Sequence, residues 1–454
     1  MSINLEDPTR HAVLGSLENR SSYTARPRDR LFETSGDSQV AEKVSDTIRP
    51  LGSLEHVLWL LDQNRSCHFA MTAQIAGRTS PDRWREALDR VQARHPLLSV
   101  RIEGSPGSVP CFRQVDAAAI PLRIVDRDPK TQWEREVGEE VATPFDPNRA
   151  PLIRAVLIQG SQDTAFILVA HHSIADGLSL AYAIRDTLSA LSGELLEPLG
   201  LQPALEEMLG VAAGSAAFAD DHEQPDDPPI GKPSTYRPLD DARPVVKGLR
   251  LPRGLTTRLR DRARLEGTTV HGALCAAFVI AGRQVSPGWR DSALRILSPI
   301  NIRPLLEVGE SSGVFINAAT STFDRQAIGF WELARDAKAA VAVGQTRDAV
   351  LASLSAIGEI VGKGAEIATA ANLAADAFAR EGVLTNLGVL NFENRFGDLK
   401  LESMWGPAVV TSMEGEQTIG VTTLNGSLCL THTSHTPPEG LLEAMRRVLV
   451  DACQ

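Results

Sequence analysis

Apolar and polar positions in the first part of the chain follow the periods of short helices and strands. Residues 54–61 carry apolar side chains at helical spacing and indicate a helix, whereas residues 68–75 alternate as in a strand. A helix is predicted from Pro81 to about Ala93, because apolar residues recur every three or four positions after a proline suited to a first turn. The next apolar stretch, residues 96–102, predicts a further strand.

Two short apolar runs come next and are followed by a helical pattern. The runs at residues 152–158 and 164–170 are separated by Gly160-Ser161-Gln162-Asp163, which predicts a hairpin or two buried strands. Beyond them, apolar residues at helical spacing predict a helix that begins at about Leu178 and ends at Gly193. The segment 171–177 should therefore form a turn between a buried strand and a helix.

A change in composition divides the chain. Residues 219–244 are acidic, rich in proline and lack an apolar period, which predicts an extended linker. Residues 1–48 also lack a sustained apolar period and are predicted to be a flexible extension. The expected organisation is an extension over 1–48, a first domain over 49–204, a linker over 205–245 and a second domain over 246–454.

The second domain should have the same mixed content as the first. A helix is predicted from Thr269 to about Gly282. Strands are predicted at residues 293–299, 314–322, 383–390, 418–424 and 427–433. Two α/β domains of similar length are therefore expected, which agrees with a chain of 454 residues.

Composition excludes several classes of protein. The 43% of hydrophobic and 23% of charged residues are typical of a globular protein, and the net charge of −11 argues against nucleic acid as a main partner. The five cysteines are widely spaced and odd in number, which favours reduced thiols over a disulfide framework or a zinc site. No signal peptide and no membrane-spanning run is evident, so we expect a cytoplasmic protein.

The chemistry is concentrated in the segment His171-His172-Ser173-Ile174-Ala175-Asp176-Gly177. A neutral imidazole is suited to removing a proton from an alcohol or amine near pH 7. Asp176 is close enough in sequence to His172 to anchor the turn, and Gly177 suits a position where a side chain would crowd the backbone. The alternative is that both histidines are bonded core residues at a strand end.

This segment has the pattern His-His-x-x-x-Asp-Gly and resembles the chloramphenicol-acetyltransferase-like superfamily. Other segments are similar to segments of the same superfamily, so the resemblance covers about residues 50–454. They are Arg94-His95-Pro96-Leu97-Leu98, Pro144-Phe145-Asp146 with Pro151-Leu152-Ile153-Arg154, residues 268–277, Asn301-Ile302-Arg303-Pro304 and Thr385-Asn386-Leu387-Gly388.

The resemblance implies a role for each residue of the motif. His172 matches the general base and His171 a supporting residue, while Asp176 matches a structural carboxylate that pairs with an arginine, here Arg303. Gly177 matches a glycine that leaves room at the channel. The implied fold is a V-shaped pseudo-dimer of two acyltransferase-like domains, each a mixed sheet flanked by helices, with a channel between them.

The resemblance also narrows the activity. The motif lies early in a long chain, which favours the monomeric two-domain branch, and the late DFGWG segment of the plant-type enzymes is absent. The best match is therefore to polyketide-associated and alcohol-acetyltransferase-like enzymes, which make esters. No bound cofactor is implied; the donor is acyl-CoA or a phosphopantetheinyl carrier protein, and the acceptor is a hydroxyl or amine. The alternatives are a freestanding peptide-condensation enzyme that forms an amide, and a catalytically silent carrier-binding or scaffold protein.

Three further groups of residues allow two interpretations each. Five arginines within residues 253–264 could bind phosphates, but a solvated helix face explains them better. His432 and His435 would point to opposite faces of a strand, so we expect no metal there. Asn386 and Thr385 are candidate substrate-binding residues because the resemblance places their strand near the channel; hydrogen bonding at a strand end is the alternative.

Overall fold

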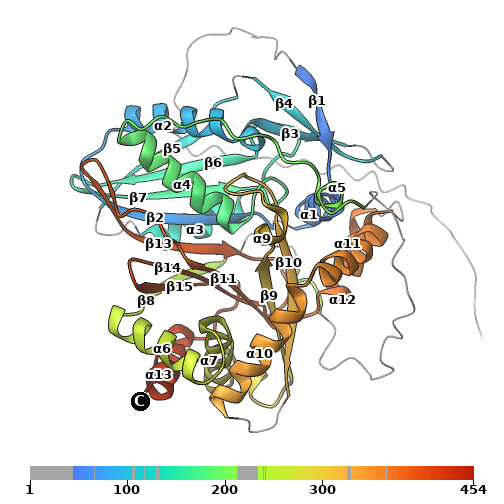
Figure 1. Ribbon diagram of the computed structural model, residues 1–454, viewed down its shortest axis with the longest axis vertical. Coiled ribbons are helices and arrows are strands. Elements are labelled where there is room, and N and C mark those ends of the chain that lie inside the picture. The colour runs from blue at the N-terminus through green and yellow to red at the C-terminus, as the bar shows by residue number, and fades with distance from the viewer. Residues whose placement is uncertain are drawn as a thin grey trace, which may run out of the picture. The chain divides into compact units, whose positions relative to one another are not determined.

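The computed structural model describes residues 44–454 except 66, 105–107, 117, 129–131, 212–233, 239, 241, 325–328 and 363–365. The first half folds into β1 (Val44–Pro50), α1 (Ser53–Asn64), β2 (Phe69–Ala76), α2 (Pro81–Arg94), the 3-10 helix η1 (Pro96–Ser99), β3 (Val100–Glu103), β4 (Cys111–Val115), β5 (Leu122–Asp126), α3 (Trp133–Ala142), β6 (Ile153–Gln159), β7 (Asp163–Ala170), α4 (Gly177–Leu191) and α5 (Leu205–Met208). These elements are labelled in Figure 1.

The second half has the same mixed content. It folds into β8 (Val245–Arg250), α6 (Arg253–Leu265), α7 (Val270–Val285), α8 (Pro287–Arg290), β9 (Leu294–Asn301), α9 (Arg303–Leu306), β10 (Ile316–Phe323), α10 (Phe330–Gly344), α11 (Arg347–Gly362), α12 (Ile367–Ala377), β11 (Gly382–Val389), β12 (Arg395–Phe396), β13 (Leu399–Val409), β14 (Gln417–Leu424), β15 (Ser427–Ser434) and α13 (Leu441–Ala452). The predicted α/β class is confirmed, with two six-stranded mixed sheets and a smaller sheet of order β1-β4-β3.

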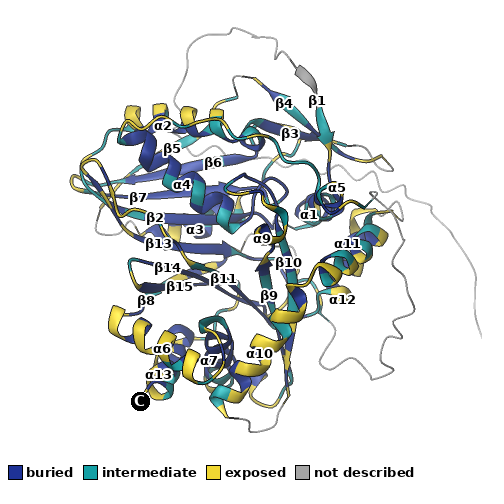
Figure 2. Cartoon of the chain, viewed as in Figure 1, coloured by how far each residue is buried: buried dark blue, intermediate teal, exposed yellow. Residues whose placement is uncertain are grey.

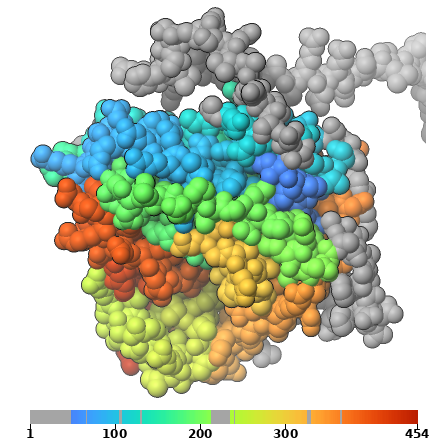
Figure 3. Space-filling view, turned by 45° about the horizontal axis from the view of Figure 1, so that its top comes forward, coloured from blue at the N-terminus to red at the C-terminus, as the bar shows by residue number. Residues whose placement is uncertain are grey.

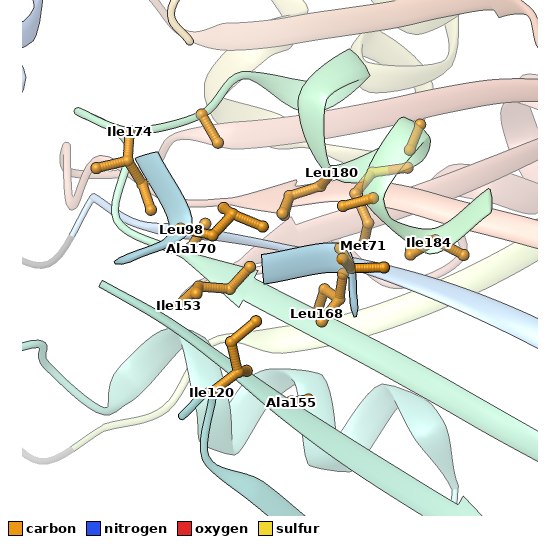
Figure 4. Packing of buried hydrophobic residues seen from close by; sticks show 14 of the residues in the cluster. Met71, Leu98, Ile120, Ile153, Ala155, Leu168, Ala170, Ile174, Leu180 and Ile184 are labelled. Carbon is orange, nitrogen blue, oxygen red and sulfur yellow. The ribbon is translucent and has the colours of Figure 1, made fainter. Parts of the chain in front are cut away.

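The first six-stranded sheet has the order β12-β13-β2-β7-β6-β5 and is covered on both faces. Alternate residues of β7 enter two different cores: Phe166 and Leu168 pack with α2 and α4, whereas Ile167 and Val169 pack with α3. Because both faces are buried, β7 is a continuous apolar run rather than an alternating one. Figure 4 shows Met71, Leu168 and Leu180 in the first of these cores.

The second six-stranded sheet has the order β10-β9-β11-β14-β15-β8. Its central strands β14 and β15 are buried at every position. Helices α6, α7, α10 and α13 pack on this sheet and form one apolar core with it. Their outward faces are exposed, as the yellow parts of α6 and α10 show in Figure 2. The apolar α7 lies inside this core, which explains why its sequence has so few polar positions.

The second half contributes strands β12 and β13 to the first sheet, which the hydrophobic pattern did not indicate. Strand β13 of the second half pairs antiparallel with β2, from Lys400 opposite Ala76 to Val409 opposite Phe69. Helix α4 contacts β12 and β13, and Figure 3 shows orange residues of the second half against blue and green ones of the first. The first sheet is therefore completed by residues of the predicted second domain, and a boundary in the linker does not separate the sheets.

Three predicted segments differ in detail. Residues 96–102 are not one strand, because Pro96–Ser99 forms η1 and only Val100–Glu103 forms β3; the consecutive burial of Leu97 and Leu98 produced an apolar run without strand geometry. The predicted linker over 205–245 begins with helix α5, whose Leu205 is buried, and residues 212–233 lie outside the described residues. The predicted extension over 1–48 lies outside them as far as residue 43, and its end forms β1.

Within the described part of the chain, no single helix is long and apolar enough to cross a membrane. Helices α6 and α7 are long and apolar enough only when taken together, and they are bent by 104° relative to each other.

Candidate active site

The turn between β7 and α4 carries the histidine motif. The backbone of His171 donates to the carbonyl of Leu152 at 2.9 Å, which continues the β6–β7 pairing into the turn. Asp176 ends the turn as the N-cap of α4, because its Oδ1 accepts from the Ser179 N–H at 2.9 Å. A buried strand and a capped helix therefore hold the seven-residue segment at both ends.

The ring of His172 is fixed by a backbone carbonyl and an aromatic neighbour. Its Nδ1 lies 3.1 Å from the Ala175 carbonyl oxygen, so Nδ1 carries the proton and donates it. The ring lies 4.6 Å from the ring of Phe69, centroid to centroid. Burial lowers the pKa of His172 below its ordinary value of 6.5. In this tautomer Nε2 is an unprotonated acceptor near neutral pH, and no described residue bonds to it.

His171 faces away from this position and belongs to a buried polar cluster. Its Nδ1 accepts from the Ser173 N–H at 3.1 Å, and its Nε2 lies 3.5 Å from Asp62 Oδ2. Burial lowers the pKa of His171 to about 4, although Asp62 opposes that shift. The His171 imidazole is therefore neutral at pH 7, and its contacts fix the backbone from which His172 projects.

Asp62 is the residue that joins this cluster, and the sequence interpretation missed it. Its Oδ1 accepts from the backbone N–H groups of Cys67 and His68 at 2.8 and 3.2 Å, and lies 3.3 Å from His68 Nδ1. Burial would raise the pKa of Asp62, but the hydrogen bond from His68 and the nearby His171 hold it well below its usual range. An acidic residue within the apolar helix α1 was the only signal in the sequence.

Asp176 and Arg303 meet as the resemblance predicts. Arg303 Nη1 donates to Asp176 Oδ2 at 2.6 Å, and Nη2 donates to Oδ1 at 3.0 Å. The Phe315 N–H donates to Oδ2 at 3.1 Å, so both carboxylate oxygens are occupied. Burial would raise the pKa of Asp176, but Arg303 outweighs it and lowers that pKa. The contact is confirmed, and it ties the turn to the segment after β9 in the second half.

A second polar connection between the halves starts from the segment Arg94-His95. His95 Nε2 lies 2.9 Å from Asp186 Oδ2 on α4, and its Nδ1 lies 3.0 Å from Ser312 Oγ. Arg94 Nε also donates to Asp186 at 2.8 Å. Residue 312 belongs to the loop between α9 and β10, and the backbone carbonyl of the next residue, Gly313, accepts from the Asp176 N–H. Both connections therefore hold the same loop against α4.

His172 lines a cavity of about 90 Å³ whose wall contains the other predicted site residues except His171. The wall includes Asp176, Gly177, Arg303, Thr385 and Asn386. Thr385 and Asn386 lie on β11, so the cavity is built from both halves of the described chain. Asn386 Oδ1 accepts from the Gly388 N–H at 2.9 Å, which leaves its amide N–H₂ as the group able to donate to a ligand.

Gly177 lies where the two halves approach closely at this cavity. A Cβ on residue 177 would lie 2.7 Å from Leu387 Cδ2 and 2.8 Å from Pro407 Cγ. Both neighbours line the cavity. Any larger side chain would therefore displace part of the wall, so the close packing at this position requires a glycine.

A second cavity of about 200 Å³ also reaches His172 and is lined mainly by apolar side chains. It shares Pro299, Ile316, Val383 and Val409 with the first cavity. Most of the remaining apolar wall comes from α1, α11 and α12, together with Tyr236 and Met413. Two cavities of different character thus meet at the same imidazole.

The other sequence candidates lie elsewhere. Arg260 and Arg262 on α6 pair with Asp261 and Glu266 at 2.9 and 2.7 Å, and no arginine of that helix lines either cavity at His172. The solvated helix face is therefore the better interpretation of this basic run. His432 is buried and its Nε2 lies 2.8 Å from Gln417 Oε1.

In comparisons with known proteins, two family models match parts of the chain. Residues 56–203 match the condensation domain, and residues 240–426 match the C-terminal part of phthiocerol/phthiodiolone dimycocerosyl transferase. A phosphinothricin tripeptide synthetase from Streptomyces viridochromogenes is 28% identical over 301 residues, which are 59% of this chain but 27% of that protein. Tyrocidine synthase 3 from Brevibacillus parabrevis is 26% identical over 344 residues, which are 67% of this chain and 5% of that protein. The chain thus spans only a small part of the length of these curated relatives.

Two solved structures have a similar fold. Polyketide synthase associated protein 5 from Mycobacterium tuberculosis superposes with a TM-score of 0.61 over 90% of this chain and 99% of that one, at 18% identity. A trichothecene 15-O-acetyltransferase from Fusarium sporotrichioides gives a TM-score of 0.63 over 89% and 94%, at 12% identity. At these identities the likeness establishes the fold, and the family assignment rests on the two matched models.

Proposed function

Because the chain belongs to the chloramphenicol-acetyltransferase-like superfamily of condensation and acyltransferase proteins, we propose that it transfers an acyl group from a thioester to a hydroxyl. His172 acts as the general base, and the product is an ester. The donor is acyl-CoA or an acyl group on a phosphopantetheinyl carrier protein. The observation that carries this proposal is the tautomer of His172, whose Nδ1–H is held by the Ala175 carbonyl.

The proposed reaction needs one proton acceptor and no other reagent. His172 Nε2 takes the proton of the acceptor hydroxyl while its oxygen attacks the thioester carbonyl carbon. The resulting tetrahedral oxyanion collapses, the C–S bond breaks, and the leaving thiolate takes the proton back from the imidazolium. The lowered pKa of His172 keeps the imidazole neutral before the attack.

The oxyanion needs a donor placed where the charge develops. Asn386 is our candidate, because its Oδ1 is engaged by Gly388 and its N–H₂ remains available in the wall that contains His172. The hydroxyl of Thr385 is a second candidate, since this residue lines the same wall. Both Nη atoms of Arg303 donate to the Asp176 carboxylate, so this pair positions the turn and does not transfer protons.

The experiment is a transfer assay with purified protein, a panel of acyl-CoAs and a panel of alcohols and amines. Thiol release reports the loss of the donor, and mass spectrometry identifies the product. We expect an ester whose formation falls about 10²–10⁴-fold in His172→Ala. Asn386→Ala should lower kcat with a smaller change in KM, because an oxyanion contact exists only in the transition state. Unchanged ester formation by His172→Ala would refute the mechanism.

Amide formation is the second candidate, because residues 56–203 match the condensation-domain model. The same panel distinguishes it by the acceptor: an amide product, or transfer only from an acyl carrier protein, would favour condensation over ester formation. If neither product forms with any donor, including carrier-bound acyl groups, the silent binding protein becomes the better description.

A further inference from the structure

The second cavity at His172 is apolar on nearly all sides. Leu54, Val57 and Leu61 of α1 line it together with Leu354 and Ile357 of α11, and Ala374 of α12 contributes to the same wall. An apolar space of this kind disfavours water and favours a ligand made of carbon and hydrogen. The wall therefore selects its ligand by apolar contact.

Most polar groups of this wall are already used by the protein. Arg380 donates to Glu416 at 3.0 Å, and Asn317 Nδ2 donates to the Gly344 carbonyl at 2.9 Å. The Tyr236 hydroxyl donates to the Ala371 carbonyl at 3.1 Å. The two arginines of the wall, Arg65 and Arg380, both donate to backbone carbonyls, which argues against a phosphate or carboxylate ligand.

Two buried side-chain atoms of the described wall have no hydrogen-bond partner, Thr418 Oγ1 and Arg65 Nε. Together with Nε2 of His172, these two atoms offer too few hydrogen bonds to solvate a polar ligand that fills a cavity of about 200 Å³. A ligand with many polar atoms would therefore lose hydrogen bonds on entering this space.

We propose that this cavity holds an aliphatic chain of several carbons, carried by one of the two substrates. The inference rests on the proposed function. The apolar cavity is a substrate site because it adjoins the reacting imidazole, at the junction of the two cavities. The chain would extend from the reacting carbon or oxygen at His172 between α1 and the pair α11–α12. The polar arm of the thioester would then lie outside this cavity.

The aliphatic chain can belong to the acyl donor or to an alcohol acceptor. Two series of substrates distinguish these two possibilities. One series varies the donor as acetyl-, hexanoyl- and dodecanoyl-CoA with a short alcohol. The other varies the alcohol with acetyl-CoA. Each methylene that enters the cavity should raise kcat/KM about fourfold until the space is filled. A rise of kcat/KM with chain length in one series assigns the aliphatic chain to that substrate. No rise in either series would overturn the proposal.

A variant that fills the cavity tests its location. Ala374→Phe places a ring in the wall, and Ala377→Phe makes the same change on an exposed position of α12 as a matched control. We expect Ala374→Phe to abolish the chain-length preference, and Ala377→Phe to behave like the wild type. Equal loss for every chain length in Ala374→Phe, at an unchanged melting temperature, would overturn the proposal. If Ala374→Phe does not fold, Ser353→Phe on α11 takes its place.

Binding without turnover separates this inference from the proposed function. Titration of His172→Ala with N-dodecyl dansylamide, whose free alkyl end is uncharged, should give saturable fluorescence, weakened at least about tenfold by adding Ala374→Phe. Binding by this protein, combined with an absence of transfer by the wild type, would refute the enzyme proposal and support the cavity. A signal that Ala374→Phe leaves unchanged would overturn the cavity assignment.

Discussion

Asp176 and Arg303 are 127 residues apart in the sequence and form a buried pair with two hydrogen bonds, of 2.6 and 3.0 Å. The carboxylate also caps α4 through Ser179, so a single side chain ends the histidine turn and holds the second half. The guanidinium lies over the ring of Phe315, with its central carbon 4.8 Å from the ring centroid. The geometry of the turn therefore depends on residues of both halves.

Breaking this pair should be costly. Asp176→Ala or Arg303→Ala leaves the partner charged and buried, so each should lower the free energy of unfolding by about 3–5 kcal/mol. The double variant should lose less than the sum, because residues in one pair couple. Urea unfolding of the four proteins measures this cycle, with the exposed Arg447→Ala as control. Strict additivity would contradict a positioning role for the pair.

The pair also predicts a pH dependence of stability. The pKa of Asp176 is lowered in the folded protein, so its contribution is fully present above the unfolded value of about 3.9 and is lost as the pH falls through the folded value. Wild type should therefore lose stability below about pH 4 more steeply than Asp176→Asn. Parallel unfolding midpoints of the two proteins across this range would contradict the prediction.

The activity of the wild type should have an acidic limb below pH 6.5. The base must be neutral, and burial lowers the pKa of His172 below that ordinary value. A profile of kcat/KM between about pH 4.5 and 8 covers this range. An acidic limb above 6.5 would mean that the imidazole is stabilised as a cation, which this site does not favour.

His171 should affect stability more than chemistry. Its pKa is lowered to about 4, so the folded protein does not bind a proton that the unfolded chain binds near 6.5. Stability should therefore decline as the pH falls from 6.5 to about 4, and His171→Gln should reduce that decline. Unfolding in urea at several pH values measures it. An identical pH dependence in the variant would show that other groups cause the decline.

Gly177→Ala should damage the cavity. The added methyl group would lie 2.7 Å from Leu387 and 2.8 Å from Pro407, so one or both must move. We expect a loss of about 1–3 kcal/mol of stability and lower activity, with partial recovery in Gly177→Ala/Leu387→Ala. Gly200→Ala is the matched control, because its Cβ would meet open space. Equal behaviour of the two single variants would refute the steric role.

The local features of this protein could be predicted from the order of its residues. The pattern of apolar residues predicted α2, the strands β6 and β7, α4 and α7, because the apolar side chains that these elements bury are close together in the sequence. The seven residues of the motif also lie on one continuous turn, so their order was enough to predict that His172 and Asp176 share it. The partner Arg303 came from the resemblance and not from any pattern of the residues.

The features assembled from distant segments became visible only in the folded chain. The insertion of β13 beside β2, the cluster of Asp62 with His68 and His171, and the apolar cavity between α1, α11 and α12 leave no local signal. In each case packing between segments far apart in the chain brings the residues together, and a one-dimensional pattern records only that a position is apolar or charged. The turn that carries the histidine motif is therefore readable in the sequence, whereas the space in which a substrate would lie is not.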